Sequence, residues 1–250
     1  MPMQRVECIG APGTGKSSLY RHLCSVRTRS WRTEKDLSYD LVPRPLRGCV
    51  QATTLLSTEV EERIVTTIRK RKSRPHAFTQ NQEYAHFIAD LLALFQKSSK
   101  PSWWKLAGLC SIKEILEDIL FFESTHAPHE RPLLVDEGVA HKAYCVLPGT
   151  DSHETKTLKH YFHHAPLPAA VLYLHASVET VYTRLSQRKK KLPLHATLTS
   201  EQLQREQDTA RHIAEILANK GVSVLSLNAE QSPHDMMKKA IPFLRNLSHA

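Results

Sequence analysis

Eight residues near the start of the chain have the types and spacing of a phosphate-binding loop. From Gly10 to Ser17 they read G-A-P-G-T-G-K-S, which fits G-x-x-x-x-G-K-[ST]. The glycines allow backbone N–H groups to turn toward an anion, the lysine reaches the β- and γ-phosphates, and the hydroxyl ligates Mg²⁺. The sequence therefore predicts a nucleoside triphosphate site. The residues expected to line it are Gly10, Ala11, Pro12, Gly13, Thr14, Gly15, Lys16, Ser17 and Ser18.

A pair of acids follows a short apolar run in L-L-V-D-E-G, which begins at Leu133. Ligands of open α/β sheets lie at the carboxyl ends of the strands, so an acid at this position can face a nucleotide. Asp136 could hold Mg²⁺ directly or through water, and Glu137 lies one residue further toward an acceptor. One of the two could take a proton from an acceptor hydroxyl. The sequence leaves open which acid binds the metal and which is the base.

Two arginines are four residues apart on an expected helix. Arg184 and Arg188 would then share one helical face. Arg188 could stabilise charge on the transferred group, and Arg184 could stack on the base. A lid over about residues 188–200 would exclude water from the reaction. The alternative is an ordinary basic helix surface.

Strand and helix patterns alternate along the chain, which predicts a parallel sheet with helices on both faces. Strands are expected at residues 5–9, 37–42, 132–135, 169–174 and 222–227. Helices are expected at residues 16–25, 53–72, 82–97, 105–123, 178–190, 203–219 and 232–246, the last interrupted near Pro242. We expect one domain over residues 1–250, with a helical acceptor-side region at about 27–130.

Composition narrows the classes of protein. With 250 residues, 41% of them hydrophobic, the chain can bury a full core, and it has no apolar run of about 18 residues that would span a membrane. Its five cysteines include no C-x-x-C, which favours reduced thiols and a cytoplasmic location. The net charge of +9 favours anionic partners, either phosphate-bearing substrates or nucleic acid.

Three stretches together resemble the P-loop kinases, the group that includes thymidylate, adenylate and deoxynucleoside kinases. They are the loop at Gly10, L-L-V-D-E-G at Leu133, and V-L-Y-L-H-A-S-V-E-T-V-Y-T-R-L-S-Q-R from Val171. The resemblance covers roughly the first 25 residues and then residues 131–246. It implies a five-stranded parallel sheet and transfer of the γ-phosphoryl group of ATP with Mg²⁺. It also implies that Arg184 packs on adenine, that Arg188 meets phosphates, and that the base is contacted near Asn228.

The chain departs from these kinases after the acid of the second stretch. Thymidylate and deoxynucleoside kinases carry an arginine there, where this chain has Asp136-Glu137-Gly138. The acceptor therefore stays open: a nucleoside, a nucleotide, a sugar, another small alcohol or a modified polynucleotide. A nucleic-acid-directed kinase or an ATP-dependent nucleic-acid-binding protein is the alternative. A GTPase fits worse, because N-K-G-V at residues 219–222 lacks the aspartate of N-K-x-D.

Several other residues could bind a ligand. A histidine-rich segment could be drawn as a metal site, but it has no H-E-x-x-H spacing and is interpreted as a polar surface. Its members are Asp151, His153, Glu154, His160, His163 and His164. Trp103-Trp104 could stack on a base, although packing at a helix start is favoured. Candidate acceptor contacts are Arg44, Arg47 and residues 80–84.

Overall fold

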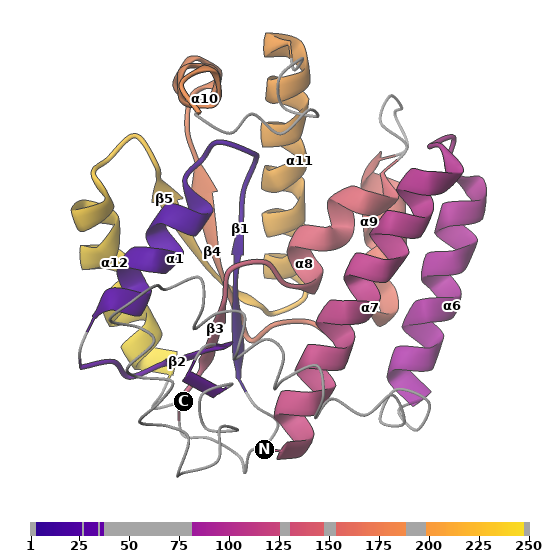
Figure 1. Cartoon of the computed structure of the whole chain (residues 1–250), viewed down its shortest axis with the longest axis horizontal. Helices are drawn as coiled ribbons and strands as arrows, with labels where there is room; N and C mark the ends of the chain where they lie inside the picture. The colour runs from indigo at the N-terminus through magenta and orange to yellow at the C-terminus, as the bar shows by residue number, and fades with distance from the viewer. Residues whose placement is uncertain are drawn as a thin grey trace, which may run out of the picture.

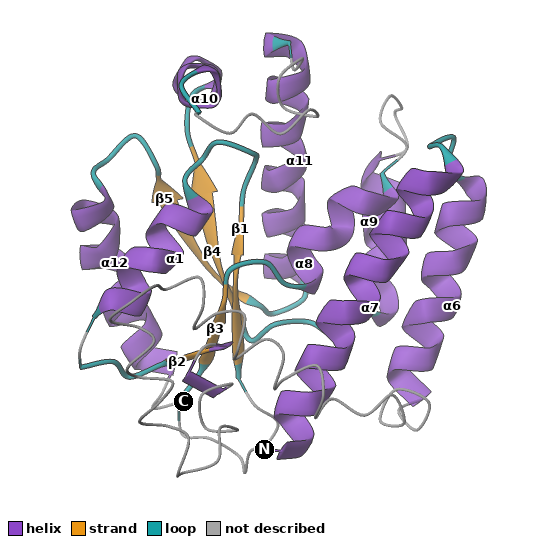
Figure 2. Ribbon diagram, in the orientation of Figure 1, coloured by secondary structure: helices purple, strands orange, loops and turns teal. Residues whose placement is uncertain are grey.

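A five-stranded parallel sheet forms the centre of the protein in the computed structural model, which describes residues 4–26, 28–34, 36–37, 82–125, 131–147, 154–188 and 199–247. The strands lie in the order β2-β3-β1-β4-β5, and every neighbouring pair is parallel (Figures 1 and 2). Their bounds are β1 Arg5–Ile9, β2 Arg32–Thr33, β3 Leu133–Val135, β4 Ala170–His175 and β5 Ser223–Asn228. This confirms the predicted fold class.

One face of the sheet is covered by α1 (Lys16–Ser25) and α12 (Pro233–Leu247). Successive side chains of a strand point to opposite faces, so Val6 and Cys8 of β1 both face this layer. The core that they join also contains Leu19 of α1 and Met236 of α12. Packing on this face therefore fixes the position of α1 relative to β1, and with it the position of the loop that joins them.

The other face is covered by a thicker helical layer (Figure 1). Its elements are α6 (Gln82–Lys97), α7 (Ser102–Thr125), α8 (Val139–Lys142), the 3-10 helix η1 (Ala143–Val146), α9 (Glu154–His164) and α11 (Ser200–Asn219). Ile9 of β1 and Val171 of β4 join the core of this layer with Leu217 of α11. The remaining helix, α10 (Val178–Ser186), follows β4 beyond the carboxyl end of the sheet.

Most expected elements lie where the sequence places them. The bounds of β1, α1 and α6 match the prediction, and β3, β4, β5 and α11 are shifted by at most a few residues. α7 begins at Ser102 and so is longer than expected. No element was predicted where α8, η1 and α9 lie. The helix expected at residues 53–72 lies outside the described residues.

Three predictions about elements are wrong: the place of the second strand, the interruption of α12 and the end of the helix expected at residues 178–190. The second strand is Arg32–Thr33 rather than residues 37–42, because Asp36 accepts hydrogen bonds from the backbone and hydroxyl of Thr33 and ends the strand. Leu37 lies in a helical turn and packs against Phe121, while residues 38–42 are outside the described part. α12 is not interrupted but continues through Pro242.

The helix expected to reach residue 190 ends at Ser186, where the N–H of Gln187 closes the last turn onto the carbonyl of Thr183. No helix in the described part of the chain is both long and apolar enough to cross a membrane.

Candidate nucleotide-binding site

The loop between β1 and α1 folds as a tight turn in which Gly10, Gly13 and Gly15 all have positive φ angles. Gly10 has φ 150° and Gly15, at the start of α1, has φ 92°. Both values lie in the region that L-residues with a Cβ rarely adopt. A Cβ on Gly10 would also collide with the backbone carbonyl oxygen of Leu174 in β4. The turn therefore depends on the glycines that the motif contains.

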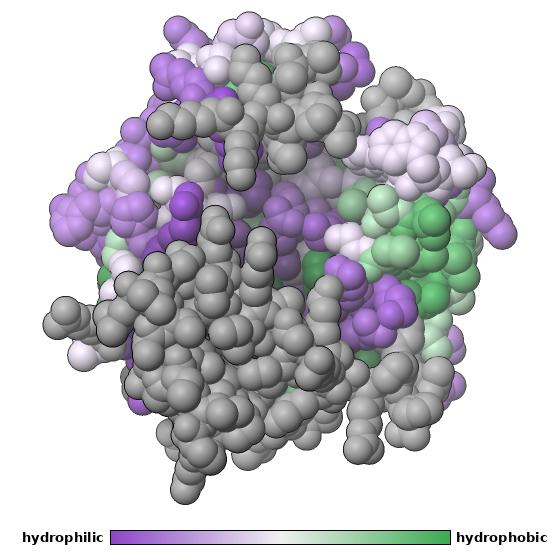
Figure 3. Space-filling model, in the orientation of Figure 1, coloured by the Kyte–Doolittle hydropathy of each residue, from purple (hydrophilic) through white to green (hydrophobic). Residues whose placement is uncertain are grey.

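The start of α1 leaves its backbone donors available. Within the described residues, no side chain caps the N-terminal end at Gly15. The first N–H groups of a helix have no partner inside the helix, and together with the helix dipole they favour an anion. Figure 3 shows a recess near the middle of the molecule that is lined by hydrophilic side chains.

Lys16 lies across the loop that it belongs to. Its Nζ donates to the carbonyl oxygens of Gly10, at 2.6 Å, and Ala11, at 3.1 Å. The side chain is buried, and burial lowers the pKa of Lys16 despite the nearby acids Glu137 and Asp136. A phosphate oxygen entering the loop can take over these hydrogen bonds and pair with a cation that water screens poorly.

Asp136 follows the end of β3 and meets α1 from the neighbouring strand. Its carboxylate is hydrogen-bonded to the hydroxyl of Ser17. The Oδ1 atom is buried and has no hydrogen-bond partner within the part of the chain that the structure describes. Burial raises the pKa of Asp136, and the hydrogen bond from Ser17 only partly opposes this. A buried carboxylate oxygen beside a serine hydroxyl is a set of hard oxygen donors that fits Mg²⁺.

Glu137 lies in a different electrostatic setting from Asp136. Its Oε2 accepts from Lys142 Nζ at 2.7 Å, and its Oε1 lies 3.5 Å from His141 Nε2. Burial opposes ionisation of Glu137, but His141, Lys142 and Lys16 outweigh burial and hold its pKa below the usual value. Burial, reinforced by the charge of Lys16, lowers the pKa of His141 to about 3. Near neutral pH the site thus contains an ionised Glu137 and a neutral imidazole.

The turn that carries both acids is held from below by Glu7 of β1. The Glu7 side chain is fully buried, its Oε1 accepts from Arg5 Nε at 2.7 Å, and its Oε2 accepts from the N–H of Ala140 at 2.7 Å. A Cβ on Gly138 would overlap the Glu7 carboxylate. This role is not among those predicted from the sequence. Its local signal is an acid in the middle of β1, between the apolar residues Val6 and Cys8.

Arg184 connects α10 to the loop after β5. Its Nη2 donates to the carbonyl oxygen of Ala229 at 2.8 Å, next to Asn228, whose Oδ1 accepts from the N–H of Glu230. Arg184 and Asn228, predicted as base contacts, therefore lie near one another. Arg188 is exposed and lies beyond the end of α10, so the expectation that it shares a helical face with Arg184 is wrong. Residues 189–198, most of the expected lid, lie outside the described residues.

The acceptor-side candidates are only partly described. Residues 82–84 open α6, and Tyr84 is buried with its hydroxyl 3.3 Å from Glu123 Oε2. Trp103 and Trp104 contact each other edge to face at the start of α7, where Trp103 is exposed, and Lys100 Nζ lies 5.3 Å from the Trp104 ring centroid. Arg44, Arg47 and residues 80–81 lie outside the described part, as does the basic run at residues 69–74.

Comparison with known proteins identifies the fold. No protein-family model matches the chain, and no curated protein sequence matches it. Among the solved structures that match is a deoxyadenosine kinase from M. mycoides, determined with dCMP and dCDP bound. The TM-score is 0.51 and the identity 11%, over 97% of this chain and 99% of that chain. At this identity the likeness concerns the fold: the chain has the α/β fold of that nucleoside kinase, with a five-stranded parallel sheet.

Proposed function

We propose that the protein is a kinase that transfers the γ-phosphoryl group of ATP to a hydroxyl, or a phosphate, of a small nucleoside-, nucleotide- or sugar-like acceptor. One observation carries the proposal: Lys16 lies across the glycine loop, and the hydroxyl of the next residue, Ser17, bonds to the half-buried Asp136. Phosphoryl transfer requires backbone N–H groups that bind the phosphates, an ammonium group and a pair of metal-binding oxygens.

The two acids have separate roles in this proposal. Ser17 and Asp136 would hold Mg²⁺, because Asp136 bonds to Ser17 and its buried Oδ1 has no hydrogen-bond partner among the described residues. When bound, Mg²⁺ supplies positive charge that screens the phosphates. Glu137 is the base, because its lowered pKa keeps it ionised and able to accept the proton of the attacking hydroxyl. Lys16 and the loop N–H groups stabilise charge on the β- and γ-phosphates.

The nucleotide base and the transferred group would be contacted from α10. Arg184 is already oriented by its bond to the carbonyl of Ala229, so its guanidinium can pack on adenine beside Asn228. Arg188, exposed beyond the end of α10, would contact the phosphates once nucleotide is bound.

A nucleoside is the acceptor that we favour. One of the solved structures with a similar fold is a deoxyadenosine kinase. In addition, the residue after the two acids is Gly138, which the buried Glu7 carboxylate restricts to glycine, so no side chain at that position can grip an acceptor phosphate. A free hydroxyl compound therefore fits this edge of the site better than a nucleoside monophosphate.

The test is a transfer assay with γ-labelled ATP and Mg²⁺. Deoxynucleosides, ribonucleosides, nucleoside monophosphates and sugars are supplied in separate reactions, together with an oligonucleotide bearing a free 5′-hydroxyl. We expect label on a nucleoside, its loss on chelation of Mg²⁺, and its loss in Lys16→Ala. Lys220→Ala, an exposed lysine at the end of α11, is the matched control and should retain activity. Release of inorganic phosphate alone, or label only on the oligonucleotide, would contradict the proposal.

A further inference from the structure

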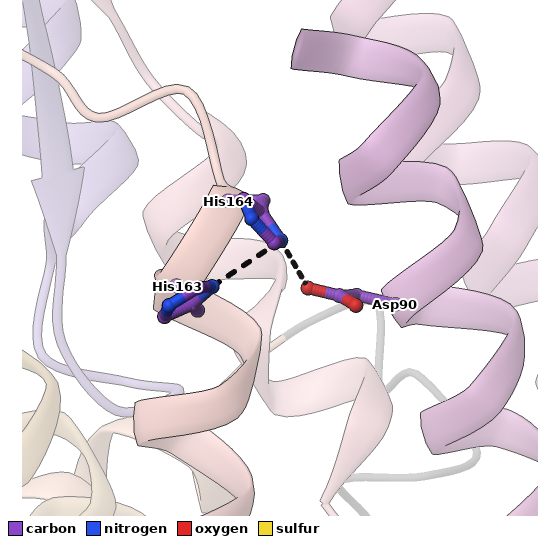
Figure 4. Close-up of side chains that lie close together, drawn as sticks. All are labelled: Asp90, His163 and His164. Atoms are coloured by element: carbon purple, nitrogen blue, oxygen red, sulfur yellow. Dashed lines mark hydrogen bonds and ion pairs between the residues drawn. The ribbon is translucent and has the colours of Figure 1, made fainter.

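A carboxylate and two imidazoles meet between α6 and α9, away from the phosphate-binding loop (Figure 4). Asp90 Oδ2 lies 2.7 Å from His164 Nδ1, and His164 Nδ1 lies 3.3 Å from His163 Nδ1. One ligand atom from each of the three residues lies within 4.8 Å of the other two. We propose that Asp90, His163 and His164 form a binding site for a transition-metal ion of the Zn²⁺ type.

The distances fit four-coordinate geometry with little adjustment. In a tetrahedral zinc site, bonds of 2.0–2.1 Å place neighbouring ligand atoms about 3.3 Å apart. The two imidazole nitrogens already have this separation. The carboxylate oxygen would have to move away from His164 by roughly 0.6 Å. The three side chains lie on the outside of the two helices, half-buried or exposed, so rotation about their own bonds can supply this movement.

Each of the two helices presents a second potential ligand one turn away. His160 precedes His164 by four residues, and its Nε2 lies 3.6 Å from Asp90 Oδ1. His86 precedes Asp90 by four residues, and its ring centroid lies 5.6 Å from that of His164. Side chains four apart share one helical face, so α6 and α9 turn matching pairs toward each other. His160 or a water molecule would complete the coordination.

The chemistry of the group favours a borderline metal ion over Mg²⁺ or Ca²⁺. Imidazole nitrogens suit Zn²⁺, Co²⁺, Ni²⁺ and Cu²⁺, whereas the hard cations take oxygen ligands such as those of Ser17 and Asp136. His163 and His164 are also the last two residues of α9, where the negative end of the helix dipole favours a cation. A bound ion would accept a lone pair from Nδ1 of His163 and from Nδ1 of His164. Without an ion, one of these two nitrogens must carry a hydrogen and donate it to the other.

A metal in this site would connect two parts of the helical layer. α6 belongs to the acceptor-side region, and α9 leads within a few residues into β4. Just after α9, the carbonyl of Pro166 accepts from Arg5, the partner of Glu7 in β1. The ion would therefore join α6 to the segment that enters the sheet, and we expect it to raise the melting temperature of the protein.

The experiment is a Co²⁺ titration of the full chain, without any affinity tag, followed by visible absorption and then by displacement with Zn²⁺. We expect one equivalent of Co²⁺ with the strong absorption of a tetrahedral site. Loss of outer-sphere partners alone weakens metal sites by about 10–100-fold, so removing a ligand should weaken binding at least tenfold. The ligand variants are His164→Ala, His163→Ala and the isosteric Asp90→Asn.

The matched control is His234→Ala, which removes an exposed histidine from α12 on the opposite face of the sheet. It should bind Co²⁺ like the wild type, and circular dichroism should show that every variant is folded. No saturable binding by the wild type would overturn the proposal and leave an ordinary hydrogen-bonded surface group. Equal binding by the wild type and all three folded ligand variants would overturn it as well.

Discussion

At the scale of single residues, the two adjacent acids are distinguished by their surroundings. Asp136 is raised in pKa by burial and bonds to Ser17, whereas Glu137 is lowered in pKa by its cationic neighbours and pairs with Lys142. A buried acid with a raised pKa lowers the stability of the folded protein when it is ionised. An ionised acid with a lowered pKa raises that stability. The two side chains therefore act in opposite directions on stability, although we propose that both serve the same site.

Asp136→Asn should lower the turnover number by orders of magnitude and at the same time raise the free energy of unfolding near neutral pH. The raised pKa means that ionised Asp136 destabilises the fold as pH rises through the folded-state value, and asparagine removes this cost. The measurements are transfer kinetics and urea unfolding at pH 7.5.

Glu137→Gln is the matched comparison. It should lower turnover by about 100-fold or more, as expected for loss of a general base, but it should lower stability, because the ion pair to Lys142 is lost. The assignment fails if the two variants shift stability in the same direction, or if neither changes turnover.

Gly138→Ala should destabilise the protein by about 1–3 kcal/mol, the usual cost of overpacking, because the new methyl group meets the Glu7 carboxylate. It should also lower activity, since the displaced turn carries Glu137. A double-mutant cycle with Glu7→Ala measures the contact itself: the two changes should cost clearly less together than the sum of their separate costs. Additive costs would show that Glu7 and Gly138 do not restrict each other.

At the scale of elements, α12 shows how packing overrides a local signal. Met236, Ala240 and Leu244, spaced four residues apart, bury one stripe of the helix in the core that it shares with α1. Pro242 is exposed on another side of the helix. Because proline has no backbone N–H, it cannot donate the usual helical hydrogen bond to the carbonyl of Lys238. Burial of the stripe outweighs that loss, which is why the predicted interruption does not occur.

Pro242→Ala should raise the free energy of unfolding, by up to about 3 kcal/mol, because it restores the backbone hydrogen bond and the better helix propensity of alanine. Lys239→Ala, at an exposed position of the same helix, should change stability by no more than about 0.5 kcal/mol. Thermal and urea unfolding of both variants give the comparison. A loss of stability in Pro242→Ala would mean that α12 depends on the proline in a way that its packing does not indicate.

The same elements show which parts of the structure could be predicted. Strands and helices with clear periodicity and a motif at their ends, such as β1, α1 and β3, follow from local sequence. β2 could not be placed, because two residues carry little pattern and Asp36 ends the strand through its side chain. The contacts of Glu7 with Gly138 and of Asp90 with His164 join residues more than 70 positions apart, and nothing local in the sequence identifies the partner of either acid.

At the scale of the whole molecule, the strand order assembles the site. β1 lies between β3 and β4, so the loop after β1 opens beside the acids that follow β3 and below the helix that follows β4. Carboxyl ends of parallel strands meet at one edge of the sheet, which is where such folds bind ligands. The three stretches noted in the sequence are thereby brought to one edge of the sheet.

Calorimetric titration with ATP, ADP and adenosine, in the presence of Mg²⁺, tests most directly whether the loop at Gly10 binds a nucleotide through its phosphates. We expect ATP and ADP to bind, adenosine to bind far more weakly, and Lys16→Ala to lose at least about tenfold in affinity for ATP, since a charged hydrogen-bonded contact contributes about 1.5–3 kcal/mol. Absence of ATP binding by the wild type would contradict the account. Equal affinity for ATP and adenosine, or unchanged ATP affinity in a folded Lys16→Ala, would contradict it too.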